Sequence, residues 1–272
     1  MRSRKFLLLL GTVVMIAVGM VIYGCSGDDT PTGTTGNPNN PEFLEVKGQV
    51  STLVDSTLNW FNGGLGSIHH LQGDGTVNPI YYGPSDPETT TTDTSEYKNG
   101  WHVIHFAFTT SNYSMVQYDS IQFRRNGAYQ QNASDLDALR LRHRWQYNAQ
   151  DTTVTHCNYA GNTNFSFDNL DQEQCDVTGT CNWMANSKQV CADSTVWRGF
   201  DIDVDITGGK INKTPTGWSQ GTLEEGTFSV TIEMTYQKDS DAPVTTNWNA
   251  VVAFNSGTNS TAVSCGDVTW TY

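Results

Sequence analysis

Apolar and polar residues alternate along most of the second half of the chain. From Thr227 to Tyr236 every second residue is apolar, and the segments 200–206 and 139–145 show the same period. A period of two is typical of strands that bury one face and leave the other in water. Turn-forming pairs such as Asn126-Gly127 and Gly208-Gly209 separate these segments. Roughly nine to eleven strands follow one another without a long helix between them, which predicts an antiparallel meander.

One segment near the start of the body has a helical period instead. Its apolar residues recur every three or four positions, which places them on one face of a helix; they are Phe43, Val46, Val50, Leu53, Val54, Leu58 and Phe61. Pro41 and Glu42 suit the first turn of this helix, and Gly63-Gly64 predicts its end.

These patterns predict a mainly β fold of the α+β class with one N-terminal amphipathic helix. The long strands favour a curved sheet or incomplete barrel that is closed by the helix. A β-sandwich with the helix packed at one end is the alternative, and periodicity alone does not separate the two. The length of the segment 43–272 suits a single β-rich globular domain.

The N-terminus has the layout of a secretory signal. Basic residues precede an unbroken apolar run from Phe6 to Ile22, which ends at Gly24-Cys25. This ending resembles that of bacterial lipoproteins, in which an aliphatic residue, a small residue and an invariant cysteine direct cleavage before the cysteine and attach lipid to its sulfur. Ile22, Gly24 and Cys25 fit the pattern, although Tyr23 is bulkier than usual. The resemblance covers only this segment and implies a signal peptide over 1–24 and a lipidated Cys25.

Residues 25–42 combine that cysteine with a Gly-, Pro-, Asn- and Thr-rich stretch that has too little apolar surface to fold, so we expect a flexible linker. By the same resemblance, Ser26 favours the outer membrane over the inner one. The expected location is therefore the bacterial cell envelope, with the protein held to the membrane by its N-terminal lipid. An uncleaved transmembrane anchor is the alternative, because the apolar run approaches the ~18–20 residues that span a bilayer.

The composition narrows the possible partners. The formal net charge is −13, and nucleic-acid binding needs basic patches, so a nucleic-acid partner is excluded. Envelope proteins or lipid are the partners that remain.

Export permits disulfides, and we expect one among Cys175, Cys181 and Cys191. Cys157 and Cys265 are the other cysteines beyond Cys25.

Charged residues form two rows with the spacing of one strand face. Asp201, Asp203 and Asp205 resemble the start of a calcium loop, but Ile206 stands where such a loop needs glycine. Residues on one strand face also lie about 6.6 Å apart, so we expect a solvated face and no metal site. The arginines at 140, 142 and 144 have the same spacing, and a cross-strand ladder between the two rows is our hypothesis.

The chain contains no sequence motif of a known catalytic or cofactor site, so we expect neither catalytic residues nor cofactors. His102 and His143 lie on apolar rows and are candidate ligand contacts if a cavity exists. Trp183, Trp197 and Trp218 lie in or beside expected loops and are candidate exposed contacts, because aromatic platforms bind sugars and lipids.

Three functions are consistent with these sequence features. The first is a non-catalytic envelope lipoprotein with a structural or interaction role. The second is a carrier of an apolar ligand such as a lipid, which requires a hollow between sheet and helix; the analogy with lipid carriers of half-barrel fold is one of fold alone. The third is a secreted carbohydrate-binding module or hydrolase, which predicts a surface cleft with paired carboxylates or an exposed tryptophan.

Overall fold

A computed structural model describes residues 41–70, 90–109, 113–131, 135–150, 155–190, 192–214, 217–218, 223–255, 260–265 and 268–271. The signal peptide expected over 1–24, the lipidated Cys25 and nearly all of the linker expected over 25–42 lie outside these residues. The domain expected over 43–272 is therefore described in most of its length, but its tether is not.

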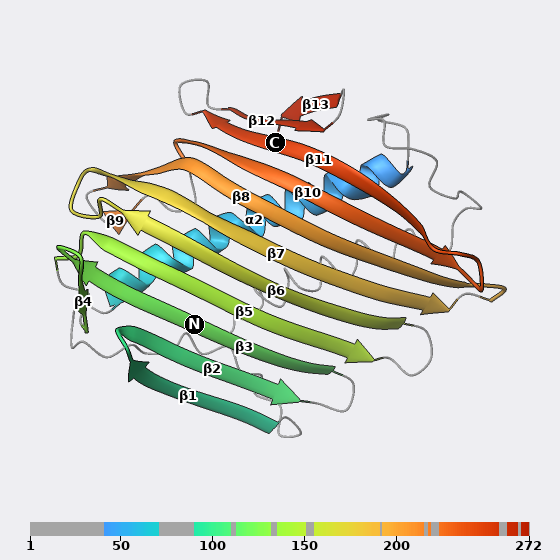
Figure 1. The fold of residues 1–272 in the computed structure, drawn as a ribbon, viewed down its shortest axis with the longest axis horizontal. Coiled ribbons are helices and arrows are strands. Elements are labelled where there is room, and N and C mark those ends of the chain that lie inside the picture. Colours follow the sequence, from blue (N-terminus) through green and yellow to red (C-terminus); the bar gives the residue numbers. More distant parts are fainter. Residues whose placement is uncertain are drawn as a thin grey trace.

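The described strands form one open, 13-stranded antiparallel sheet (Figure 1). Its strands are β1 (Thr90–Lys98), β2 (Trp101–Thr109), β3 (Tyr113–Arg125), β4 (Ala128–Gln130), β5 (Ala138–Gln150), β6 (Thr155–Asp168), β7 (Gln174–Val190), β8 (Thr195–Thr214), β9 (Gly217–Trp218), β10 (Glu225–Lys238), β11 (Val244–Asn255), β12 (Ser260–Cys265) and β13 (Val268–Thr271). They are neighbours in chain order, except that β4 pairs only with β3 and β9 only with β8. The predicted antiparallel meander is confirmed, and it forms a single open sheet rather than a sandwich.

Helix α2 (Pro41–His70) lies diagonally across one face of this sheet (Figure 1). Near its start Phe43 contacts Trp248 of β11, and near its middle Trp60 contacts His143 of β5. The predicted helix is confirmed, but its predicted end at Gly63-Gly64 is wrong. Two glycines cost a helix about 2 kcal/mol, and burial of Leu65 in the next turn helps to offset that cost.

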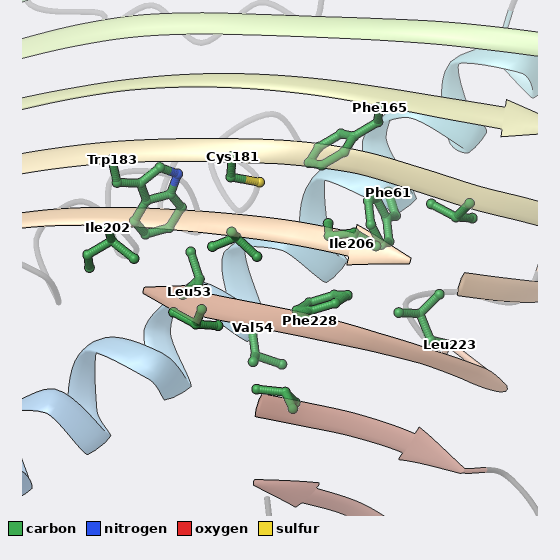
Figure 2. Packing of buried hydrophobic residues seen from close by; sticks show 14 of the residues in the cluster. Leu53, Val54, Phe61, Phe165, Cys181, Trp183, Ile202, Ile206, Leu223 and Phe228 are labelled. Carbon is green, nitrogen blue, oxygen red and sulfur yellow. The ribbon is translucent and has the colours of Figure 1, made fainter. Parts of the chain in front are cut away.

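The apolar stripe of α2 fills the space against the sheet (Figure 2). Six of the seven residues predicted for the stripe are buried and Leu58 is partly buried. Phe61 is the centre of an aromatic cluster, with ring centroids 4.8 Å from Phe165, 5.6 Å from Phe167 and 6.4 Å from Phe228. We call the covered face of the sheet the inner face and the opposite one the outer face.

Polar contacts add to this packing at the start of the helix. The buried Glu42 carboxylate accepts hydrogen bonds from the Thr246 hydroxyl and, at 3.1 Å, from the Trp248 indole. One turn later Glu45 accepts a hydrogen bond of 2.9 Å from the Arg198 guanidinium. These contacts join the N-terminal turns of α2 to β11 and β8, so the helix is fixed to strands far from it in the sequence.

The two charged rows lie on the outer face, but they do not meet. The aspartates of β8 are flanked by β7 and β10, whereas the arginines of β5 are flanked by β3 and β6. The hypothesis of a ladder between them is therefore wrong, because β6 and β7 separate the two strands. Asn182 instead donates to Asp201 and Asp203 at 3.1 and 2.9 Å, and Arg140 pairs with Asp168 at 2.8 Å.

The glycine pair at 208–209 does not end a strand as predicted. Gly208 has a φ of +62°, and the pairing of β8 shifts register on both sides of it, against β7 and against β10. This is a β-bulge, in which glycine accepts the left-handed backbone and the ladder continues. Asn126-Gly127, by contrast, has positive φ at both residues and forms the predicted turn between β3 and β4.

Among the cysteines whose side chains are described, Cys175, Cys181 and Cys265 are free and buried. The disulfide expected among Cys175, Cys181 and Cys191 is therefore not present in the structure. Cys175 and Cys181 both lie on β7, and six residues of strand separate them by about 20 Å, far beyond the reach of a disulfide. The side chains of Cys157 and Cys191 lie outside the described part.

Candidate functional site

The outer face carries a shallow hollow over β7, β8 and β10. Its volume is about 290 Å³, and side chains from all three strands line it. Most of its lining residues lie on the outer face of the strands, and Arg198 and Phe200, whose side chains belong to the inner side, also border it. We call it the Gly199 hollow, after the residue at its centre.

Strand register builds this hollow as a grid of nine positions. Each residue of β8 has one neighbour on β7 and one on β10, and alternate residues share the outer face. The three rows are Lys188–Trp197–Gln237, Asn186–Gly199–Thr235 and Met184–Asp201–Glu233. Gly199 therefore has eight side chains around it and none of its own, which leaves the hollow.

The bottom of the hollow keeps its shape only because residue 199 has no side chain. A Cβ atom at this position would lie 2.9 Å from the side-chain oxygen of Asn186 and 3.8 Å from the Cβ of Thr235. The Asn186 amide therefore reaches over the glycine, close to space that a side chain would otherwise take. Its backbone needs no left-handed conformation, so the glycine matters here for space rather than for flexibility.

Trp197 forms one wall of the hollow and is 41% exposed. The Lys188 ammonium lies 4.6 Å from the centre of the indole ring, a cation–π contact that holds the ring in place. Met184 on the opposite row is 44% exposed. The prediction that Trp197 is an exposed aromatic residue is confirmed, and it stands among other side chains that could contact a ligand.

Hydrogen bonds hold several polar groups at the rim. Asp201 accepts from Asn182, the Thr235 hydroxyl lies 3.2 Å from that of Thr245, and the Gln237 amide donates 2.9 Å to the Asp241 carbonyl. Asp201 also faces Glu233 across the strands, so two carboxylates share one row. The arrangement offers acceptors and amide groups beside an apolar ring.

The prediction for Trp183 is wrong. It lies on β7 and is only 5% exposed, with its ring 5.4 Å from that of Trp60 and 6.2 Å from that of Trp145. The turn-forming residues around it suggested a loop, but the alternation of β7 continues through them and directs this indole inwards. Trp218 lies in β9, and its side chain is outside the described part of the structure.

His102 lies on the inner face, where it contacts a backbone carbonyl and two aromatic rings. Its Nε2 is 2.9 Å from the Gln131 carbonyl, and its ring lies 4.7 Å from Tyr97 and 5.3 Å from Phe123. Burial lowers the pKa of His102, and the hydrogen bond to the carbonyl acts in the opposite direction. The ring therefore fills space among aromatic neighbours.

His143 lies on the same face, but it contacts a carboxylate and an indole ring. Its Nδ1 pairs with the Asp119 carboxylate, which also accepts 2.7 Å from the Gln117 amide, and its ring lies 5.2 Å from Trp60. Thr163 and then Cys181 follow it across the inner face. Burial raises the pKa of the Cys181 thiol to about 12, so no thiolate is available there as a nucleophile at neutral pH.

Of the four predicted contact residues whose side chains the structure describes, only Trp197 lines the hollow. His102 and His143 lie on the inner face, where they contact Gln131 and Asp119, and neither lines the Gly199 hollow. Sequence reasoning missed Met184, Asn186, Gly199 and Glu233. The signal for them is the missing side chain at Gly199, midway between Trp197 and Asp201 on an otherwise regular outer row.

Within the described residues, no group of three or more His, Cys, Asp or Glu side chains could hold a metal ion. None of the described helices combines the length and the apolar character that crossing a membrane requires. No protein-family model matches the chain, and neither a curated protein nor a solved structure is significantly similar to it.

Proposed function

We propose that the chain is a non-catalytic binding lipoprotein of the bacterial cell envelope, held to the outer membrane through Cys25. The observation that carries the proposal is the difference between the two faces of the sheet. Helix α2 packs on the inner face (Figure 1), whereas among the described residues the outer face carries the Gly199 hollow. In this reading the linker holds the outer face away from the lipid surface, where it can meet a partner.

The packing of the inner face argues against the carrier alternative. A carrier needs a hollow beside residues such as Phe228 and Ile232, but both are fully buried. Phe228 is packed against Phe61 of α2 and, at 4.8 Å, against Phe254. An apolar ligand would have to displace the helix and separate this cluster, at a cost of about 1.5–3 kcal/mol for each aromatic side chain exposed.

The test uses the full-length chain in a double-membrane bacterium fed labelled palmitate, with a photocrosslinking amino acid at Met184. We expect label on the protein, recovery with the outer membrane, and a discrete crosslinked product from Met184, because that residue is exposed beside the hollow. Cys25→Ser should abolish the label, since the sulfur is the expected attachment point.

The same crosslinker at Leu44 is the matched control, because Leu44 is 42% exposed but lies on α2. It should give no such product. The proposal would fail if wild-type protein carried no palmitate, or if Met184 and Leu44 gave the same products.

A further inference from the structure

We infer that the Gly199 hollow binds one sugar ring of an uncharged hexopyranose polymer. This inference rests on the proposed function, and it adds the chemical class of the ligand. The grid of side chains around Gly199 combines a fixed aromatic wall with a dense rim of hydrogen-bonding groups. A sugar ring has matching surfaces, because it presents apolar C–H groups on one side and hydroxyl groups around its edge.

The size of the hollow suits one ring. Its volume of about 290 Å³ lies at the lower end of the range for small-molecule sites. Three positions along a strand face span about 13 Å, and three neighbouring strands span about 10 Å. The hollow is open along the sheet, so the rest of a polymer can continue over the outer face without entering a closed cavity.

The aromatic wall is pre-positioned. Lys188, from the same chain, holds the Trp197 ring, so stacking a sugar on the remaining exposed part of the ring costs little conformational entropy. Met184 adds a flexible apolar surface on the opposite row. The glycine between them leaves room for the Asn186 side-chain oxygen to lie over β8, which a side chain at 199 would prevent.

The polar rim matches hydroxyl groups. The carboxylates of Asp201 and Glu233 accept hydrogen bonds, and the Asn186 and Gln237 amides both donate and accept. Hydrogen bonds to ionised carboxylates are among the stronger ones available to a neutral ligand. The Thr235 hydroxyl completes the row through Gly199.

The charged and polar groups of the hollow disfavour anionic ligands and lipids. The grid holds two carboxylates and one ammonium, and that ammonium already lies over Trp197. Arg198 also borders the hollow, but its guanidinium pairs with Glu45 of α2. A phosphate or an acidic sugar would be repelled by the carboxylates at close range. A lipid would leave the polar rim without partners, which costs free energy when those groups are desolvated. An uncharged sugar meets neither penalty.

The experiment measures binding of cellohexaose, mannohexaose and N-acetylated chitohexaose to the full-length protein in nanodiscs, by saturation-transfer NMR and calorimetry. We expect at least one hexasaccharide to bind, and we expect Trp197→Ala and Asn186→Ala each to weaken that binding at least tenfold. Gly199→Val should weaken it further by filling the hollow. Asn249→Ala is the matched control, because this exposed residue lies on β11 outside the grid, and it should leave affinity within twofold.

Melting temperatures within about 4 °C of wild type would show that the variants are folded. The sugar inference is overturned if no hexasaccharide binds, or if binding survives Trp197→Ala and Gly199→Val alike. If no hexasaccharide binds but Met184 still gives a discrete crosslinked product in cells, the sugar inference fails and the binding function stands. Cleavage of a bound hexasaccharide would instead overturn the non-catalytic proposal.

Discussion

Replacement of Phe61 by alanine should lower the free energy of unfolding by about 3–5 kcal/mol. Phe61 is buried beneath the sheet and makes edge-on contacts with Phe165, Phe167 and Phe228 (Figure 2). Truncation removes those contacts with β6 and β10 and leaves a cavity between helix and sheet, which the tightly packed surroundings can fill only in part. Denaturant unfolding of the full-length protein, followed by circular dichroism, measures the change.

Leu44→Ala is the matched control for this experiment. Leu44 belongs to the same helix but is 42% exposed, so its truncation should cost no more than about 0.5 kcal/mol. A loss below about 1 kcal/mol for Phe61→Ala would contradict the account, because it would mean that this part of α2 is not packed on the sheet in solution.

Replacement of Arg198 by methionine should cost about 3 kcal/mol at pH 7. The Arg198 guanidinium pairs with Glu45 at 2.9 Å, and both side chains are nearly buried. Methionine keeps the apolar stem of the side chain, so the variant removes mainly the charge. It leaves the Glu45 carboxylate buried without its cation, which is the costly way to break such a pair.

The cost should depend on pH in a defined direction. Burial raises the pKa of Glu45 above its ordinary value of 4.5, Arg198 opposes this, and Glu42 acts in the same direction as burial. In the variant the pKa of Glu45 rises further. A carboxyl group with a raised folded pKa keeps its full stability below the unfolded value and loses it as the pH rises through the folded value. The difference from wild type should therefore shrink as the pH falls from 7 towards 4.5.

The double variant Glu45→Gln/Arg198→Met separates charge from packing. It removes the buried carboxylate as well, so it should recover most of the stability that Arg198→Met loses at pH 7. Denaturation midpoints at pH 4.5, 5.5 and 7 provide the comparison. A deficit that is the same at every pH, or a double variant no more stable than the single one, would contradict the buried pair.

Much of the fold could be predicted from the sequence because alternation is a local property. The row from Phe228 to Tyr236 reveals a strand and its buried face without knowledge of any partner. The stripe from Phe43 to Phe61 reveals the helix in the same way. These residues lie where the pattern predicts, on the inner face and on the covered side of α2.

The errors arose where tertiary structure overrides local signals. Gly63-Gly64 and Gly208-Gly209 both predict an interruption, but packing carries the helix through the first pair and the sheet accommodates the second as a bulge. Trp183 lies among turn-forming residues, and yet the ladder of β7 continues on both sides of it. The turn propensity of residues near a glycine is a weak guide when long neighbouring strands supply hydrogen bonds to the segment.

The functional site depends on information that no single segment contains. Trp197 is visible as a candidate from its own sequence, but Asn186 and Glu233 become its neighbours only through the register of β7 and β10. The supposed ladder of aspartates and arginines failed for the same reason, since strand order decides which rows meet. A hollow formed by a missing side chain is recognised only when all three strands are aligned.

The claim that α2 permanently fills the inner face can be tested most directly by hydrogen–deuterium exchange on the full-length protein. We predict that the amide hydrogens of α2 between residues 46 and 61 exchange as slowly as those of β7, β8 and β10, because helix and sheet open only together. Exchange of the helix that is orders of magnitude faster than that of those strands would contradict the claim. The helix would then be a lid that opens, and the inner face would be available to an apolar ligand.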